Sequence, residues 1–173
     1  IVIETFPLKH KIPTNGFVIR EKPKERKMRK ESLEHPLMKV EYIHRLKKGE
    51  DIVTESGKVL RSVDLTDASK PVCSYAYCSD TAYAEKIIPF IQDVTVLYHE
   101  ATFTEQHREL AKITMHSTAK QAAEIARQAS VSRLYLGHLS ARYGDGSLHE
   151  AEAKDVFPNT VYVEDGMSFF VEN

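Results

Sequence analysis

Apolar positions along the chain fall into short extended runs and one clear helical repeat. The repeat covers 117–129, where alanines recur at helical spacing, and it predicts an amphipathic helix. Short apolar or alternating runs predict strands at 17–20, 72–78, 94–98 and 134–136. Strands that alternate with helices along one chain are typical of an α/β fold, in which helices cover a sheet.

Weaker patterns predict further elements around these runs. A hairpin is expected over 51–60, because Glu55-Ser56-Gly57-Lys58 has the composition of a turn between two short segments. The remaining expectations are a charged arm with a short helix over 20–34, a helix over 84–92 interrupted by Pro89, a helix over 148–156, and paired strands at 160–163 and 167–171.

Potential ligands follow four of the strand-like runs. They are Asp80 after the Tyr-rich run, His99 and Glu100 after the Val-rich run, His138 after 134–136, and His10 after Phe6-Pro7-Leu8. Open α/β sheets place their sites at the ends of strands, so we expect a functional site there.

His10, Asp80 and His138 form a set that suits a metal. Imidazole and carboxylate groups are zinc ligands in sites that keep one position open for water, and a carboxylate can bridge two ions. Taken singly, a His is more often an ordinary surface or core residue, and an Asp after a strand is more often a turn or capping residue. The combination favours a metal site.

The His116-Ser117-Thr118 segment opens the Ala-rich helix. One interpretation is a simple N-cap, since Ser and Thr accept hydrogen bonds from the first free N–H groups of a helix. The other is a phosphate site, in which His116 donates a proton to the phosphate or its leaving oxygen. Glu100 could orient that His.

Two further segments suggest contact with nucleic acid, and each has a plainer alternative. Ser140-Ala141-Arg142-Tyr143 is either a polar loop or a place where Arg binds phosphate and Tyr stacks on a base. The tract 20–30 contains seven basic and two acidic residues, and it is either a solvated face or a contact with an RNA backbone. The remaining histidines are expected at the surface: His35, His44, His107 and His149.

Composition excludes several classes of protein. With 42% hydrophobic residues, seven Gly and seven Pro in 173 residues, the chain is neither disordered nor collagen-like, and it has no apolar run long enough for a membrane span. The net charge of −1 gives no global attraction to nucleic acid. Cys73 and Cys78 are expected to be free thiols in a reducing compartment. A start at Ile1 without Met suggests a fragment.

Four segments occur in a telling order: Tyr77-Cys78-Ser79-Asp80-Thr81, Tyr98-His99-Glu100-Ala101-Thr102-Phe103, His116-Ser117-Thr118-Ala119-Lys120-Gln121-Ala122-Ala123, and Gly137-His138-Leu139-Ser140-Ala141-Arg142-Tyr143. With His10 before them, they closely resemble the C-terminal half of ribonuclease Z, the tRNA 3′-processing endoribonuclease family of the metallo-β-lactamase superfamily. The resemblance implies an αββα sandwich, of which 1–173 would form the C-terminal half.

The resemblance also implies roles for individual residues. His10 and His138 would be terminal ligands and Asp80 the bridging carboxylate of a site with two Zn²⁺ ions, while His116, oriented by Glu100, would be catalytic. The residues implied around this centre are His99, Thr102, Ser117 and Thr118. The residues implied in RNA binding are Ser140 and Arg142 in the active-site loop, with Lys22, Lys24, Arg26 and Lys27 in the basic arm.

In the family, precursor tRNA is hydrolysed just 3′ of the discriminator nucleotide, which leaves a 3′-hydroxyl on the tRNA. A metal-bound hydroxide would attack the phosphorus, and His116 would assist departure of the 3′ oxygen. The resemblance further implies a cytoplasmic homodimer with precursor tRNA as its partner and no association with membranes.

Two features differ from the family pattern. The His-x-His-x-Asp-His motif is absent from this chain, and three candidate ligands would leave two zinc ions under-coordinated, so the isolated chain is expected to be inactive. The tRNA-binding arm, expected at about 20–48, lacks glycine and is expected in a shortened form. A second sheet from the other half would cover apolar strands that this chain alone leaves partly exposed, which predicts poor solubility of the isolated fragment unless it pairs with another chain.

Two alternatives to the leading interpretation remain. One is another phosphodiesterase with the metallo-β-lactamase fold, which would discriminate poorly between precursor tRNA and a small phosphodiester. The other is a non-catalytic RNA-binding or dimerising half-domain. The presence of His10, Asp80, Glu100, His116 and His138 speaks against this second alternative.

Overall fold

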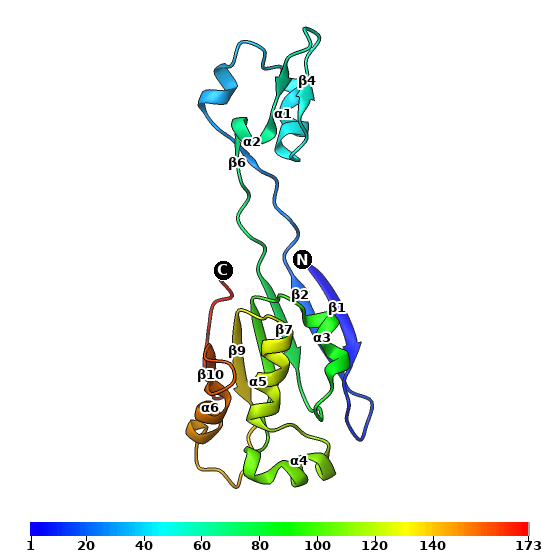
Figure 1. Cartoon of the computed structure of the whole chain (residues 1–173), viewed down its shortest axis with the longest axis vertical. Helices are drawn as coiled ribbons and strands as arrows, with labels where there is room; N and C mark the ends of the chain where they lie inside the picture. Colours follow the sequence, from blue (N-terminus) through cyan, green and yellow to red (C-terminus); the bar gives the residue numbers. More distant parts are fainter. Residues whose placement is uncertain (173) are drawn as a thin grey trace. The chain divides into compact units, whose positions relative to one another are not determined.

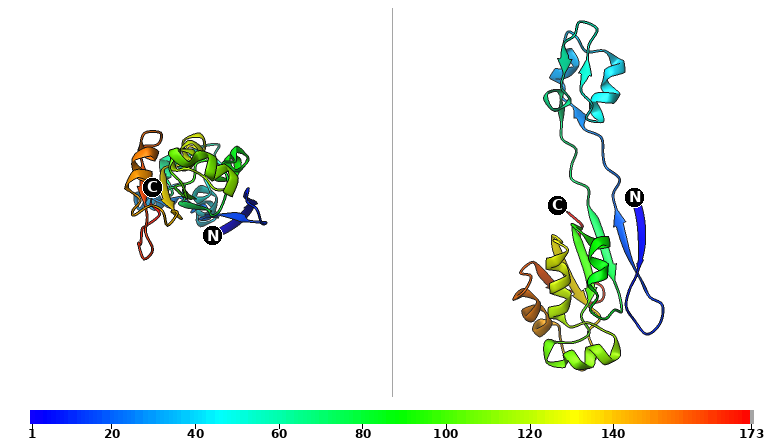
Figure 2. Two further views of the ribbon diagram at one scale, coloured as in Figure 1. Left: turned by 90° about the horizontal axis from the view of Figure 1, so that it is seen from below. Right: turned by 45° about the vertical axis from the view of Figure 1, so that its right-hand side comes forward.

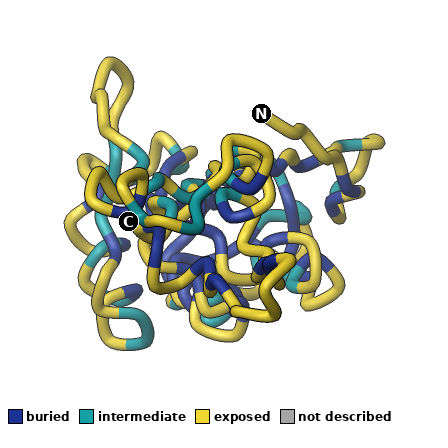
Figure 3. The backbone as a smooth tube through the Cα atoms, turned by 90° about the horizontal axis from the view of Figure 1, so that it is seen from above, coloured by how far each residue is buried: buried dark blue, intermediate teal, exposed yellow. Residues whose placement is uncertain are grey.

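The computed structural model describes residues 1–172, and the chain divides into two compact units. Unit 1 contains Ile1–Glu21 and the chain from Cys73 onward, and unit 2 is Lys22–Val72 (Figure 1). Each unit has its own hydrophobic core. In Figure 3, buried stretches of the backbone alternate with exposed ones along the chain.

Unit 1 is built on a six-stranded mixed sheet with the order β1-β2-β7-β8-β9-β10 (Figure 1). Its strands are β1 (Val2–Pro7), β2 (Asn15–Arg20), β7 (Ser74–Cys78), β8 (Val96–Glu100), β9 (Arg133–Gly137) and β10 (Thr160–Tyr162). The first three strands pair antiparallel, and β7 to β10 run parallel to one another. The carboxyl ends of β7, β8 and β9 therefore meet at one edge, as the sequence analysis required for a shared site.

Helices cover one face of this sheet (Figure 2). The helical segments of unit 1 are η2 (Glu85–Ile87), α3 (Ile88–Ile91), η3 (Glu105–His107), α4 (Arg108–Thr114), α5 (Ala119–Gln128) and α6 (Ser147–Lys154). The predicted Ala-rich helix is confirmed as α5, and Thr118 and Gln121 form a capping box at its start. Its alanines are fully buried, because small side chains allow the helix to lie close to the strands.

Over the opposite face, no helix lies among residues 1–172, and this face is rich in aromatic side chains. Tyr77 and Tyr98 stack with their ring centroids 4.9 Å apart. Phe17 is 43% exposed, Ile19 37% and Tyr77 37%, which is unusual for large side chains at the centre of a sheet. We call Phe17, Ile19, Tyr77 and Tyr98 the aromatic face.

Unit 2 is a small unit with short elements. They are β3 (Lys27–Met28), η1 (Glu31–Glu34), α1 (Val40–Lys47), β4 (Ile52–Val53), β5 (Val59–Leu60), α2 (Ser62–Leu65) and β6 (Thr66–Asp67). The hairpin predicted over 51–60 is confirmed as β4 and β5. Its core consists of Tyr42, Leu46, Ile52, Leu60 and Leu65, so this stretch folds around apolar side chains of its own.

One predicted strand is wrong. The segment 167–171 is not a strand, because Phe169 packs on Tyr135, with ring centroids 4.3 Å apart, and on Tyr75 at 6.0 Å, so the chain does not pair beside β10. The interrupted helix expected over 84–92 is confirmed as two short pieces, η2 and α3, with Pro89 at the start of the second. No helix in the part of the chain that the structure describes has the length and apolarity of a membrane span.

Candidate functional site

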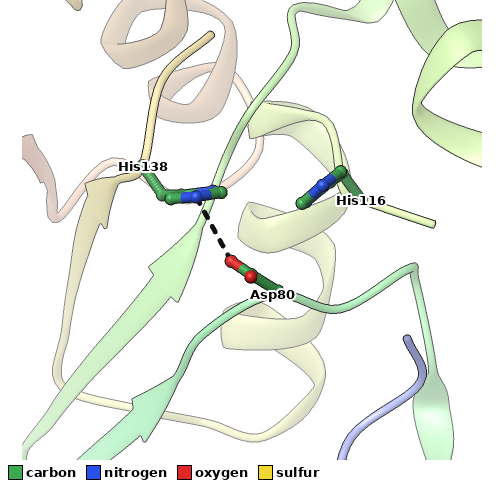
Figure 4. Close-up of side chains that lie close together, drawn as sticks. All are labelled: Asp80, His116 and His138. Carbon is green, nitrogen blue, oxygen red and sulfur yellow. Dashed lines mark ion pairs between the residues drawn. The ribbon is translucent and has the colours of Figure 1, made fainter. Parts of the chain in front are cut away.

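Asp80, His116 and His138 converge at the carboxyl edge of the sheet in unit 1. One ligand atom from each lies within 4.8 Å of the others. The Nε2 atom of His138 is 3.3 Å from Oδ1 of Asp80. Figure 4 shows the three side chains, which come from three different loops, directed toward a common point.

Local backbone geometry places these side chains. Asp80 lies in the turn just after β7, and His138 directly follows β9 with a φ of 60°. The residue before His116, Met115, ends α4 with a φ of 62°. Left-handed conformations are unfavourable for residues with a Cβ atom, and they concentrate at sites where a side chain must be aimed.

Glu100 lies beneath this group and is fully buried. Its Oε1 atom accepts hydrogen bonds from Nδ1 of His116 (2.8 Å), from the Thr81 amide (3.0 Å) and from the Ser117 amide (3.2 Å). Its Oε2 atom accepts from the amide and the hydroxyl of Thr102, at 2.9 and 2.8 Å. Five donors thus surround one carboxylate, and their hydrogen bonds offset the free-energy cost of burying its charge.

The Thr102 hydroxyl determines the tautomer of His138. The Oγ1 atom of Thr102 lies 3.0 Å from Nδ1 of His138, and its single proton goes to Glu100. The hydroxyl must therefore accept a proton from Nδ1 of His138. This leaves the lone pair of the neutral ring on Nε2, the atom that faces Asp80.

Glu100 and His116 shift each other's pKa values. Burial acts to raise the pKa of Glu100, but the hydrogen bonds from His116, Thr102 and Thr81 outweigh it and hold this pKa below its ordinary value. The hydrogen bond to Glu100 raises the pKa of His116, against a smaller effect of burial. Both shifts favour the ion pair, in which His116 is a protonated imidazolium and Glu100 is an ionised carboxylate.

His10 lies beside this group but outside the set whose ligand atoms meet within 4.8 Å. Its Nδ1 atom is 2.9 Å from the carbonyl oxygen of Met115, and its ring centroid is 5.0 Å from that of His116. The hydrogen bond to a carbonyl requires a proton on Nδ1, so the neutral ring has its lone pair on Nε2.

Comparison with known proteins identifies relatives of this chain. The chain is 45% identical over 169 residues to the ribonuclease Z of Parabacteroides distasonis, which covers 98% of this chain and 56% of that protein. It is 42% identical over 173 residues to the ribonuclease Z of Phocaeicola vulgatus, with coverage of 100% and 56%. This chain is a ribonuclease Z homologue. It spans about half the length of the curated relatives it matches.

Solved structures show the fold. The metallo-β-lactamase fold protein YhfI from Bacillus subtilis matches with a TM-score of 0.58 at 17% identity, over 94% of this chain and 46% of that one. Human tRNase Z, short form, matches with a TM-score of 0.56 at 18% identity, over 99% and 43%. The ribonuclease Z homologue thus has the metallo-β-lactamase fold expected from its motifs, and it covers about half of that domain. No family model matches the chain.

In this ribonuclease Z homologue, the residues expected around the centre are packed beneath it. His99 is buried, its Nδ1 atom donates to the Glu100 carbonyl at 2.7 Å, and burial lowers its pKa. The Ser117 hydroxyl donates to the Thr81 carbonyl at 2.6 Å. Thr118 caps α5 and donates from its hydroxyl to Glu105. These contacts connect the strand ends to the first turn of α5.

The loop after His138 contains two of the residues expected to bind RNA. Nε of Arg142 donates to the Ser140 hydroxyl at 3.1 Å, and the guanidinium lies 5.4 Å from the ring centroid of Phe103. The arginine is exposed. Tyr143 was expected to stack on a base. Its hydroxyl accepts from the Thr104 amide (3.1 Å) and lies 2.7 Å from Nδ1 of His107.

Three histidines expected at the surface lie elsewhere. His149 is fully buried in α6, with its ring edge-on to Tyr143 at 4.4 Å, because the inner face of this helix packs under the loop. His107 is half-buried against Tyr143, and His35 is half-buried in unit 2 with its ring accepting from the Leu37 amide. The weak apolar pattern of 148–156 gave no signal for the burial of His149. His44 is exposed as expected.

The basic residues expected in the arm all belong to unit 2, which begins at Lys22. Lys22, Lys24 and Lys27 are exposed. Arg26 is held inside the unit, since Nε donates to the Thr66 hydroxyl at 2.6 Å and Nη2 to its carbonyl at 3.2 Å. Its guanidinium therefore serves the structure of the unit.

The donor set fits a metal ion. Zn²⁺ accepts imidazole and carboxylate ligands, and the Nε2 lone pair of His138 faces the Asp80 carboxylate. The Thr102 hydroxyl accepts from the other ring nitrogen of His138, which fixes the orientation of the ring, as hydrogen-bond partners of zinc-binding histidines do. A larger cavity of about 430 Å³ lies at the amino ends of β8 and β9, where Thr95, Arg133 and Phe169 line it, far along the strands from these donors.

Proposed function

We propose that the protein containing this chain is a zinc-dependent endoribonuclease that removes the 3′ trailer from precursor tRNA. The observation that carries the proposal is the convergence of Asp80, His116 and His138 above a buried Glu100 in a homologue of ribonuclease Z. The name of the human structure, tRNase Z, supports tRNA as the substrate class.

Within this chain, Asp80, His138 and His10 would hold zinc. A complete site would contain two ions, with the other ligands supplied from outside this sequence, which lacks the His-x-His-x-Asp-His motif. Zinc supplies Lewis-acid stabilisation of phosphate charge and lowers the pKa of water. The chain's own part is to fix the ligand tautomers through Thr102 and the Met115 carbonyl.

His116 would act on the leaving group. Its Nδ1 proton is committed to Glu100, so Nε2 is the atom that can donate a proton to the departing 3′ oxygen of the tRNA. The hydrogen bond to Glu100 raises the pKa of His116, which favours the protonated form that an acid catalyst needs. Glu100 acts through His116 and is a positioning residue.

Substrate binding would use both units. Ser140 and Arg142 lie in the loop after His138, where an exposed guanidinium can bind phosphate in a bidentate manner. Unit 2, with Lys22, Lys24 and Lys27, would be the tRNA-binding arm, and it extends beyond the 20–48 boundary to Val72. The assembly would be a homodimer in the cytoplasm, where Cys73 and Cys78 would stay reduced.

The test is cleavage of a precursor tRNA by the full-length protein with zinc, followed by mapping of the product ends. We expect one cut that leaves a 3′-hydroxyl tRNA. His116→Ala should lower kcat by about 10²- to 10⁴-fold, the usual contribution of a general acid. Lys154→Ala, which removes a surface charge on α6, is the matched control and should cleave at the normal rate.

Two results would contradict this proposal. Equal kcat/KM for precursor tRNA and for bis(p-nitrophenyl) phosphate would identify a phosphodiesterase without tRNA specificity. Binding of precursor tRNA with no cleavage, in a protein that contains two zinc ions by elemental analysis, would identify a non-catalytic RNA-binding protein.

A further inference from the structure

A cavity of about 250 Å³ opens beside the candidate site in unit 1. His116 forms part of its wall, so the cavity and the site share one side chain. Its other main lining residues are Lys9, Tyr83, Arg108, Lys112 and Gln121. We call it the basic cavity. None of these residues except His116 has a role in the proposed reaction.

The basic cavity has an excess of positive charge. Lys9, Arg108 and Lys112 line it against a single carboxylate, Glu109. Arg108 is paired with Glu105 at 2.9 Å, but its side chain is 58% exposed, so the pairing is weak. Across residues 1–172, the Lys9 and Lys112 ammonium groups take part in no ion pair. They are available to an anion.

Two features make the cavity a built site. The Lys9 amide donates to the buried Thr81 hydroxyl at 3.1 Å, which fixes this segment next to the strand ends. The Tyr83 hydroxyl donates to Glu85 at 2.8 Å and accepts from Gln128 at 3.2 Å, which fixes the ring from its outer end. An aromatic ring held beside unpaired cations is the combination that binds single-stranded nucleic acid.

We propose that the basic cavity binds one nucleotide of single-stranded RNA adjacent to the bond that is cleaved. Its phosphate lies between Lys9 and Lys112, and its base packs on Tyr83. This inference rests on the proposed function, because His116 connects the cavity to the reacting phosphate. The volume is below the roughly 300 Å³ at which drug-sized pockets begin, so it suits a single nucleotide and excludes a duplex.

The contacts predict binding without base specificity. Lysine ammonium groups bind phosphate as point charges, and stacking on a tyrosine accepts any base. The cavity would therefore hold a single strand of any sequence. An enzyme that accepts precursors with different ends needs this property.

The experiment measures binding of a labelled, unstructured eight-nucleotide RNA to the full-length protein in EDTA, where no cleavage takes place. Affinity is determined by fluorescence anisotropy at several salt concentrations. The variants are Lys112→Ala, Lys9→Ala and Tyr83→Ala. Tyr83→Phe is matched to the last because it keeps the ring, and Lys154→Ala is matched to the lysine variants because it removes the same charge from α6.

Each lysine variant should bind more weakly, and its slope of log K against log salt should fall in magnitude by about 0.7, the value for one contact with a single-strand phosphate. Tyr83→Ala should bind about 5- to 150-fold more weakly, the loss expected for one stacked base. Tyr83→Phe and Lys154→Ala should bind as the unmodified protein does.

The outcomes separate this inference from the proposed function. If the unmodified protein cleaves precursor tRNA but the cavity variants keep its RNA affinity and salt slope, the cavity does not bind RNA. If the octamer does not bind at low salt, the inference is equally overturned. If the variants lose affinity as expected while no trailer is removed, the cavity stands and the proposed reaction fails. Thermal unfolding of each variant shows whether it is folded.

Discussion

At the residue scale, the buried carboxylate of Glu100 orients the side chains of the candidate site by accepting hydrogen bonds from His116 and Thr102. The order of polar residues at the strand ends suggests that Glu100 orients His116, and Oε1 of Glu100 lies 2.8 Å from Nδ1 of His116. Polar residues at strand ends could be found from the pattern alone. The part played by Thr102, which bonds both Glu100 and His138, could not, because it depends on which way a hydroxyl proton points.

Glu100→Gln should shift the pH dependence of cleavage. The hydrogen bond to Glu100 raises the pKa of His116, so the acid form persists to higher pH and is lost as pH rises through that pKa. With a neutral amide at position 100 the pKa of His116 falls, and the alkaline decline in kcat should move to lower pH. Glu164→Gln, an exposed matched change, should leave the profile in place. If the alkaline decline in kcat stays at the same pH in Glu100→Gln, His116 is not the general acid.

Gly137→Ala should destabilise unit 1. A Cβ atom at position 137 would lie 2.8 Å from the Tyr98 ring and would overlap the Tyr98 hydroxyl, so the tyrosine must move. Overpacking of this kind costs about 1–3 kcal/mol, measured as the loss in the free energy of unfolding. In a double-mutant cycle with Tyr98→Ala, the combined loss should be smaller than the sum of the single losses. Additive losses would show that Tyr98 is not the obstacle.

At the scale of elements, hydrophobic periodicity predicts the regular helices and strands. It does not predict segments whose conformation depends on tertiary contacts. The alanine spacing located α5, and the apolar runs located β2, β7, β8 and β9 to within a few residues. The short α4 gave no usable repeat, because a helix of two turns has too few positions to show one. The segment 167–171 has the composition of a strand, but Phe169 is placed by its contact with Tyr135.

The capping box of α5 should be measurable as stability. Thr118→Ala removes the hydroxyl that accepts from the Gln121 amide, and loss of an N-cap costs about 1 kcal/mol. Thr118→Ser keeps the hydroxyl and should unfold at nearly the same denaturant midpoint as the unmodified protein. If serine were as destabilising as alanine, the threonine would act through its methyl group and not through the cap.

At the scale of the whole molecule, the chain leaves unit 1 after Glu21 and re-enters it at Cys73. The Glu21 amide donates to the Cys73 carbonyl at 3.0 Å, next to the antiparallel pairing of β2 with β7. Unit 2 has its own core. Its size and its core were beyond sequence analysis, which expected an arm over 20–48, because several two-residue strands leave almost no pattern.

Replacing 22–72 with a short turn should leave unit 1 folded, because the ends to be joined are already neighbours. In the full-length protein, hydrolysis of bis(p-nitrophenyl) phosphate should persist. Affinity for precursor tRNA should fall by about tenfold or more, as expected when several phosphate contacts are lost. Unchanged tRNA affinity in a folded deletion variant would contradict the role of unit 2 as the arm.

The aromatic face gives this chain an optical property. The sequence contains no tryptophan, so its near-ultraviolet emission comes from tyrosine, and Tyr77 and Tyr98 stack on the aromatic face. A polypeptide that packs there changes the surroundings of these two rings, and a tryptophan in that polypeptide would accept their excitation energy. The aromatic face therefore reports its own covering through tyrosine fluorescence, without any added label.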